Sequence, residues 1–415
     1  MYRGLLFLII KYYSMEQFDF NNKRVLMRVD FNVPLDENNN ITDDTRIRKA
    51  VPTIKHIMDA GGAVILMSHL GRPQKKLKDD GTVNVDKYTL RHIVPHLSKL
   101  LGTDVQFSSN CFGAEAKSKS FLLNPGQVLL LENTRFHKEE AQGEKIFAAG
   151  LAQCGDIFIN DAFGTAHRAH ASTTVVASHF KPEQKGFGFL MKTELENADR
   201  VLNSPARPLT AILGGAKVSD KIKLLDRLTE LCQNIIVGGG MAYTFAKAAG
   251  GSVGNSLCED DYLDLAKEIV SKAKANGVDF YLPTDTVIAD DFSNSANTKI
   301  VPTGEIPDGW EGLDIGPETR EKFASVIKNS QTILWNGPQG VFEFENFAHG
   351  TDAIANAVVA ATDNGAYSLI GGGDSVAAIN KAGLGDRVSF ISTGGGAMLE
   401  YLEGRTLPGV KAIVG

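Results

Sequence analysis

The feature that most constrains this chain is a repeated alternation, in which a short apolar run ends in a polar or glycine-rich signature and a segment of helical period follows. Such alternation is typical of parallel βαβ units, in which a helix returns the chain to the start of the next strand. The strands predicted in this way are 25–31, 63–69, 128–133, 157–163, 209–214, 235–240, 280–283, 333–337, 367–373 and 388–393. Because these runs are unevenly spaced and more numerous than eight, they fit a single eight-stranded barrel poorly. The fold class predicted is α/β, with open parallel sheets flanked by helices.

A helical segment separates the strands of the first half from those of the second. Helical period runs over about 191–202, and Pro205 and Pro208 stop it. We therefore predict two α/β lobes joined by a linker helix. The predicted boundaries are 15–186 for the first lobe, 187–204 for the linker, 205–397 for the second lobe and 398–415 for a C-terminal tail.

The first residues of the chain, 1–14, contain an apolar run that Lys11 ends. The run is too short to cross a bilayer, and no small-residue cleavage site follows it. A second methionine, Met15, opens the polar segment before the first predicted strand. We expect residues 1–14 to be an extension whose removal leaves folding and turnover intact.

Composition excludes several classes of protein. Apolar residues make up 43% and charged residues 22%, without a biased tract, which excludes disordered, collagenous and disulfide-scaffold chains. Lys and Arg number 43 and Asp and Glu 49, a net charge of −6, so the chain lacks the broad cationic surface that nucleic acids require. The four cysteines have no C-x-x-C spacing, which predicts reduced thiols in a cytoplasmic enzyme. We also expect no membrane partner.

Arginine marks the ends of the predicted strands in the first half. Four such residues are Arg46, which opens a helix, Arg72, Arg135 and Arg168. Because the carboxyl ends of parallel strands meet at one edge of a sheet, we expect these side chains to share a site. Guanidinium groups bind phosphate and carboxylate in a bidentate fork, so this site suits a small, highly anionic substrate.

Other polar residues at the same edge have less specific roles. Asp30 and Asn32 could bind a substrate hydroxyl. His69, His167 and His170 lack a third ligand at metal spacing, so a structural or substrate-contacting role is predicted for them.

Glycine replaces arginine at the strand ends of the second half. The signatures GGAK at 214–217, GGGD at 371–374 and GGG at 394–396 each precede a helical pattern. Backbone N–H groups at helix N-termini can cradle phosphates, so these signatures predict a nucleotide site. Neither G-x-x-x-x-G-K-[ST] nor G-x-G-x-x-G occurs, which disfavours Walker-type NTPases and ordinary dinucleotide dehydrogenases.

Charged residues in these signatures complete the predicted nucleotide site. A helix is predicted over 216–232, with Lys217 and Lys221 together on its first turns. Asp374 could bind Mg²⁺ or act at a helix N-terminus. The segment WNGPQGVFE, with Asn336 and Glu343, is either a turn after a strand or a ligand contact.

Eleven signatures, in order between Met15 and Gly415, resemble those of the phosphoglycerate kinase family: RVDFNVP, SHLGRP, LLENTRFHKEE, DAFGTAHRAHAS, ILGGAKVSDKI, GGGMAYTF, LPTD, DIGPET, WNGPQGVFE, GGGDSVAA and STGGGAMLEYLEG. The resemblance implies two Rossmann-like lobes with a cleft between them. It also implies a 3-phosphoglycerate site on the first lobe, an MgATP or MgADP site on the second, and a C-terminal tail that packs back on the first.

The resemblance also implies roles for individual residues. The implied substrate-binding residues are Asp30, Phe31, Asn32, Arg46, His69, Leu70, Gly71, Arg72, Arg135 and Arg168. The implied nucleotide-binding residues are Lys217, Lys221, Gly238, Leu313, Asn336, Glu343, Gly372, Gly373, Asp374 and Ser375, with Asp374 on the magnesium ion. The implied catalytic residues are Arg46, Lys217, Gly372 and Gly395.

The chemistry of the residues agrees with reversible phosphoryl transfer between 1,3-bisphosphoglycerate and ADP. A carboxylate nucleophile is already ionised near neutral pH, so positioning and charge neutralisation are needed and a general base is not. An acyl phosphate hydrolyses in water, which predicts a hinge motion that closes the lobes of a monomeric enzyme. A kinase for another small phosphorylated acid would alter the arginine set. A nonenzymatic nucleotide-binding regulator predicts loss of Arg46 or Lys217, and both are present.

Overall fold

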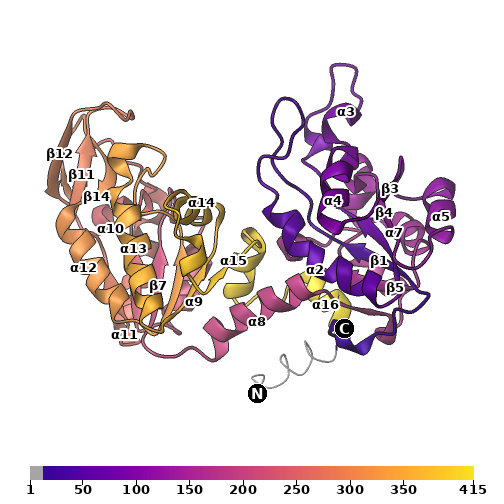
Figure 1. The fold of residues 1–415 in the computed structure, drawn as a ribbon. Coiled ribbons are helices and arrows are strands. Elements are labelled where there is room, and N and C mark those ends of the chain that lie inside the picture. Colours follow the sequence, from indigo (N-terminus) through magenta and orange to yellow (C-terminus); the bar gives the residue numbers. More distant parts are fainter. Residues whose placement is uncertain (1–12) are drawn as a thin grey trace. The chain divides into compact units, whose positions relative to one another are not determined.

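The computed structural model describes residues 13–415 and divides the chain into two compact units (Figure 1). One unit runs to Glu196 and includes Thr406–Gly415, and the other is Asn197–Arg405. The chain passes from one unit to the other within helix α8 (Phe189–Asn203), where the linker helix was predicted, and returns after Arg405.

The first unit is built on a sheet of six parallel strands in the order β3-β4-β2-β1-β5-β6. These strands are β1 (Arg24–Arg28), β2 (Ala63–Met67), β3 (Val105–Ser108), β4 (Val128–Leu131), β5 (Ile157–Asn160) and β6 (Lys185–Phe187). The α-helices of this unit are α2 (Thr45–Asp59), α3 (Val85–Tyr88), α4 (Val94–Leu101), α5 (Ala114–Phe121), α6 (Lys138–Gln142), α7 (Lys145–Ala152) and α16 (Pro408–Val414). The central strands are buried along their length, as a parallel sheet with two covered faces requires.

The second unit repeats this architecture, with six parallel strands in the order β10-β8-β7-β15-β16-β17. These strands are β7 (Leu209–Leu213), β8 (Asn234–Val237), β10 (Asp279–Tyr281), β15 (Thr332–Asn336), β16 (Tyr367–Ile370) and β17 (Phe390–Ile391). Its α-helices are α9 (Ile222–Leu228), α10 (Met241–Ala248), α11 (Leu263–Ala275), α12 (Pro317–Lys328), α13 (His349–Asp363), α14 (Gly373–Lys381) and α15 (Gly396–Leu402).

Strand order gives each sheet one point at which the direction of the strand sequence reverses. In the first sheet the chain moves from β1 to β2 on one side and from β5 to β6 on the other. In the second sheet the same reversal occurs between the neighbours β7 and β15. Ligands of open α/β sheets bind beyond the carboxyl ends of strands at such switch points. Ligand-binding residues are therefore expected in the segments after β1 and β5 and in those after β7 and β15.

All ten predicted strands are present, but the structure adds strands that the alternation did not indicate. β3 and β6 are short edge strands of the first sheet. In the second unit, β11 (Asp285–Ala289) pairs antiparallel with β12 (Thr298–Pro302) and β14 (Glu311–Ile315), and β9 (Ser252–Val253) pairs with β13 (Glu305–Ile306). Most residues of β12 are exposed, so it lacks the apolar run by which buried strands were identified.

The C-terminal tail that lies with the first unit is shorter than predicted. Residues 398–405 belong to the second unit, because α15 buries Met398 and Leu402 and packs against α9. Only Thr406–Gly415 joins the first unit (Figure 1). There the Gly409 N–H donates to the Ala166 carbonyl at 2.8 Å, and Lys185 Nζ donates to the carbonyl of Ala412 at 2.8 Å.

The predicted extension, 1–14, lies mostly outside the described residues. Its two described members belong to the first unit. The Tyr13 carbonyl accepts a hydrogen bond from the Phe187 N–H of β6 at 2.8 Å, and Ser14 is buried. Removing them would take this partner away from the Phe187 N–H, so both described residues contribute contacts to the first unit, and the dispensability of the segment for folding and turnover stays a prediction.

Candidate functional site

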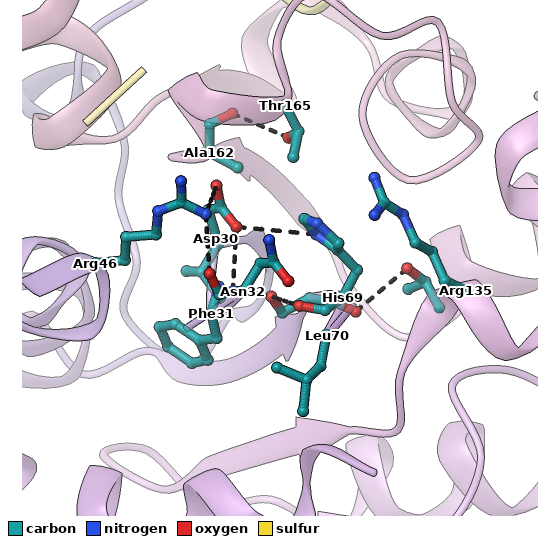
Figure 2. Close-up of polar contacts among 12 residues, drawn as sticks. Asp30, Phe31, Asn32, Arg46, His69, Leu70, Arg135, Ala162 and Thr165 are labelled. Atoms are coloured by element: carbon teal, nitrogen blue, oxygen red, sulfur yellow. Dashed lines mark hydrogen bonds and ion pairs between the residues drawn. The ribbon is translucent and has the colours of Figure 1, made fainter. Parts of the chain in front are cut away.

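In the first unit, polar side chains gather beyond the ends of β1 and β2 (Figure 2). Arg46 is the second residue of α2, and its Nη1 donates to the Asn32 carbonyl at 2.9 Å and lies 3.3 Å from Asp30 Oδ2. The side chain of Arg46 nevertheless stays 36% exposed. The guanidinium is thus held in place by the loop after β1 and still faces solvent.

His69 lies behind this pair and is almost completely buried. Arg28 Nη2 lies 3.3 Å from its Nδ1. A guanidinium can only donate, so Nδ1 accepts and the ring proton of the neutral imidazole is on Nε2. Burial, with the positive charges of Arg135 and Arg28, holds the pKa of His69 well below its ordinary value. His69 is therefore an uncharged hydrogen-bond donor at neutral pH.

The other three predicted arginines line one cavity of about 250 Å³, together with His170. Arg135 is fixed, because its Nη1 donates to the Gly71 carbonyl at 2.8 Å, and burial lowers its pKa only to about 10. Arg72 and Arg168 are exposed, and within residues 13–415 neither guanidinium has a hydrogen-bond or ion-pair partner. The cavity thus combines one fixed cation with two that are free to adjust to an anion.

Three predicted residues contribute backbone to this site. Phe31 and Leu70 are buried in the core of the first unit, and Figure 2 shows their side chains pointing away from the polar cluster. Gly71 donates its N–H to Asn32 Oδ1 at 2.8 Å and has a φ of +65°. A Cβ at this position would lie 2.5 Å from the Tyr88 ring, so both space and conformation require glycine.

Sequence reasoning did not identify Arg28, which is fully buried at the end of β1. Its Nε donates to Ser172 Oγ at 2.8 Å, and Ser172 donates from Oγ at 2.6 Å and from N at 2.9 Å to the buried carboxylate of Glu140. A buried charge is tolerated when it is paired and hydrogen-bonded, and this relay provides both. Arg28 could have been identified from the sequence, because in the motif RVD it interrupts the apolar run of a predicted strand.

In the second unit, the loop after β7 differs from the prediction. The helix expected over 216–232 begins only at Ile222, so Lys217 and Lys221 precede α9 and do not share its first turns. Residues of this loop pair with other segments: the Ser219 N–H donates to Glu259 Oε2 at 2.9 Å. Gly215, with a φ of +104°, donates its N–H to the Pro338 carbonyl at 3.1 Å and accepts from the Met241 N–H at 3.0 Å.

The two lysines of the loop have different environments. Lys217 is exposed. Lys221 Nζ donates to the carbonyls of Gly214 at 2.5 Å and Asn336 at 2.8 Å, which joins the ends of β7 and β15. Burial lowers the pKa of Lys221 to about 8, although the negative charge of Asp374 acts to raise it. Lys221 therefore organises the crevice, while Lys217 is available to a ligand.

The opposite wall of the crevice is the N-terminus of α14. Gly372 precedes this helix with a φ of +87°, and a Cβ there would lie 2.9 Å from Asn336 Nδ2. Asn336 is buried, and its Nδ2 has no hydrogen-bond partner in the described part of the chain. Ser375 Oγ accepts from the Gly337 N–H at 2.5 Å and ties α14 to the segment after β15. Asp374 is exposed on the first turn.

The remaining predicted residues of this unit fall into two groups. Gly238 and Leu313 are buried: a Cβ on Gly238 would lie 2.0 Å from Gln339 Oε1, and Leu313 packs with Phe347. Glu343 and Gly373 are exposed, and Gly395 precedes α15 with a φ of +49° and open space at its Cβ position. The structure therefore gives Gly238 and Leu313 packing roles and leaves Glu343, Gly373 and Gly395 accessible.

Residues 13–415 contain no cluster of three or more His, Cys, Asp or Glu side chains able to hold a metal ion. In the same range no helix has both the length and the apolar character needed to span a membrane.

Two α/β units with parallel sheets, one with an arginine-lined cavity and the other with glycine-rich strand ends, define an α/β phosphotransferase. A family model described as phosphoglycerate kinase matches residues 15–405. The chain belongs to the phosphoglycerate kinase family, and it catalyses phosphoryl transfer from 1,3-bisphosphoglycerate to ADP.

Individual relatives agree over nearly their whole length. The chain is 52% identical to the phosphoglycerate kinase of Porphyromonas gingivalis, over 97% of this chain and 100% of the relative, and 52% identical to a cytosolic phosphoglycerate kinase of Nicotiana tabacum, over 96% and 97%. A chloroplastic phosphoglycerate kinase of Arabidopsis thaliana is also 52% identical, over 95% and 80%. Among solved structures, phosphoglycerate kinase from Coxiella burnetii matches with a TM-score of 0.85 and 41% identity, over 96% of this chain and 98% of that chain.

Proposed function

We propose that the first unit binds the phosphoglycerate and the second unit binds the nucleotide. The observation that carries this division is the contrast between the two crevices. The first contains Arg46, Arg72, Arg135 and Arg168, whereas the second contains glycine-lined backbone and exposed Lys217. Guanidinium groups suit the separate phosphate and carboxylate of a small acid, and a glycine-rich main chain suits the phosphates of a nucleotide.

Within the first unit, the cavity lined by Arg72, Arg135 and Arg168 would hold the phosphate remote from the reaction. His69 would donate from Nε2 to the body of the substrate. Arg46, fixed between Asp30 and Asn32, would face the carboxyl end, where phosphoryl charge develops. Direct in-line transfer also requires a step that brings the two bound ligands together, during which water is excluded from the acyl phosphate.

Within the second unit, Lys217 would neutralise the transferred phosphoryl group, and the N–H groups at Gly372, Gly373 and Gly395 would bind phosphate oxygens. Asn336 and Ser375 shape the same wall, and Glu343 would contact the nucleoside. The unpaired Asn336 Nδ2 beside Gly372 is a donor that a bound phosphate would satisfy.

Asp374 would hold Mg²⁺ together with the nucleotide. Mg²⁺ commonly binds through one or two carboxylates, phosphates and water, and rarely in a cage made only of protein. The residues fit this pattern, because Asp374 is exposed at the crevice and the described chain has no larger ligand cluster. Bound there, the ion would neutralise phosphate charge.

A monomer in the cytoplasm is also part of this proposal. Every residue assigned to either ligand is supplied by one chain, so the sites need no second subunit. All four cysteines are free thiols, as is usual in a reducing compartment.

Replacing Arg168 by Ala tests the substrate side of the proposal. We expect 3-phosphoglycerate to bind about tenfold or more weakly, because one charged hydrogen bond contributes about 1.5–3 kcal/mol, while nucleotide affinity and kcat change little. Calorimetry with each ligand alone measures this. Arg91→Ala is the matched control, since Arg91 is exposed in the same unit and its guanidinium lies over the Phe107 ring. Equal weakening of both ligands would contradict the division between units.

Substrate binding is also expected to be coupled to the protonation of His170. Burial, with the charges of Arg135 and Arg28, lowers the pKa of His170 to about 4, so the ring is neutral in the free enzyme at pH 5.5. A phosphate bound in the cavity favours the charged ring and raises this pKa, so binding takes up protons. Calorimetry at pH 5.5 in buffers of different ionisation enthalpy measures the uptake.

The His170→Gln variant serves as the control for this measurement, because the substrate phosphate exchanges protons itself. We expect the variant to take up fewer protons per 3-phosphoglycerate bound than the wild type. The same proton count in both proteins would show that His170 does not respond to the ligand.

A further inference from the structure

We propose that Glu259 is a positioning residue for Lys217, a role that rests on the catalytic assignment of Lys217 in the proposed function. Lys217 lies on a loop, where helical hydrogen bonds do not hold it. A catalytic cation must be held in its productive position before the reaction, since misplacement by about 1 Å can cost about 10²-fold in rate. Residues that hold this loop in place are therefore expected to affect kcat through the position of Lys217.

On the N-terminal side of Lys217, the loop is held by backbone hydrogen bonds of Gly215 and by Lys221 Nζ, which donates to the Gly214 carbonyl at 2.5 Å. Two residues before the lysine, Gly215 donates to the Pro338 carbonyl at 3.1 Å and accepts from the Met241 N–H at 3.0 Å. Met241 is the first residue of α10. This side of the loop is thus fixed to the segment after β15 and to α10.

On the C-terminal side of Lys217, a side chain from a distant segment holds the loop. Two residues after the lysine, Ser219 donates from N to Glu259 Oε2 at 2.9 Å and from Oγ to Glu259 Oε1 at 2.6 Å. Both carboxylate oxygens are used, so the contact fixes orientation as well as distance. Burial acts to raise the pKa of Glu259, but the hydrogen bonds from Ser219 and Val218, together with the positive charge of Lys217, outweigh it, and the net pKa is lowered.

Glu259 is itself anchored to the helix that holds the other side of the loop. Its N–H donates to Thr244 Oγ1 at 3.1 Å, and Thr244 lies in α10. Its neighbour Asp260 accepts from Nζ of Lys247, also in α10, at 2.8 Å. The two attachments that bracket Lys217 therefore share α10 as a support, and Glu259 is the side chain that completes them.

The test is to measure kcat and KM for Glu259→Ala, Glu259→Gln and the control Glu230→Ala. We expect Glu259→Ala to lower kcat about tenfold while KM for 3-phosphoglycerate stays the same, because the loop loses one of its two attachments. Glu259→Gln keeps one acceptor oxygen for Ser219 and is expected to restore part of the loss. Glu230 is exposed on the same unit and pairs with Lys272, so its replacement is expected to leave kcat unchanged.

A double-mutant cycle with Lys217→Ala separates positioning from general destabilisation. If Glu259 acts through Lys217, removing it from the Lys217→Ala enzyme produces no further loss of kcat. A further tenfold loss, or a wild-type kcat for Glu259→Ala, would overturn the inference while leaving the role of Lys217 intact. A wild-type kcat for Lys217→Ala would instead overturn the proposed function of that lysine.

Discussion

Replacing Arg46 by Ala is expected to lower kcat by about 10³-fold or more, the range found for arginines that stabilise phosphoryl transfer. Arg46 is attached to the loop after β1 through the Asn32 carbonyl and Asp30, and it remains partly exposed. A cation held at a fixed position stabilises charge that develops in the transition state more than charge already present in the ground state. The dissociation constant of 3-phosphoglycerate should therefore change much less than kcat.

Arg46→Lys is the informative companion variant. An ammonium keeps the charge but cannot reproduce the planar fork that contacts both the Asn32 carbonyl and a ligand, so we expect poor recovery of kcat. The two quantities, kcat and the dissociation constant, should be measured on the same preparations. If Arg46→Ala abolishes substrate binding and leaves kcat within a few-fold, Arg46 holds the substrate, and the distinction from Arg72, Arg135 and Arg168 is wrong.

Replacing Asp374 by Ala is expected to weaken binding of the magnesium nucleotide about tenfold or more, because about 1.5–3 kcal/mol is lost with a charged contact. Binding of 3-phosphoglycerate should stay nearly unchanged, since Asp374 lies in the second unit and the arginine cavity in the first. Titration of ADP with and without Mg²⁺ provides the specific readout. The variant should differ from the wild type mainly when the ion is present.

Asp386→Ala is the matched control for this measurement, because Asp386 is an exposed carboxylate in the same unit. An equal loss of ADP affinity with and without Mg²⁺ would show that Asp374 acts on the helix or the nucleotide and does not hold the ion. An equal loss for both substrates would contradict the assignment of the two sites to different units.

The sequence by itself determined the two-lobe α/β architecture, and it predicted candidate site residues at one edge of each sheet. Hydrophobic runs of buried parallel strands are nearly continuous, so β1, β2, β4 and β7 could be located from their apolar runs in the sequence. The residues that follow such strands meet at one edge of the sheet, which is why Arg46 and the glycine signatures were predicted as candidate site residues. Local patterns carry this information because the apolar run of a strand and the residues that end it are contiguous in the sequence.

Tertiary structure alone decided how those residues are held. Arg28 reaches Glu140 through Ser172, 144 residues away in the chain from Arg28, and Glu259 reaches Ser219 across 40 residues. A helix was predicted over 216–232, but α9 begins only at Ile222, and in the loop before it the Ser219 N–H donates to Glu259 instead. Contacts between segments distant in sequence depend on how the strands are ordered and packed. Where such contacts satisfy backbone hydrogen-bonding groups, they can outweigh the intrinsic helix propensity of a segment.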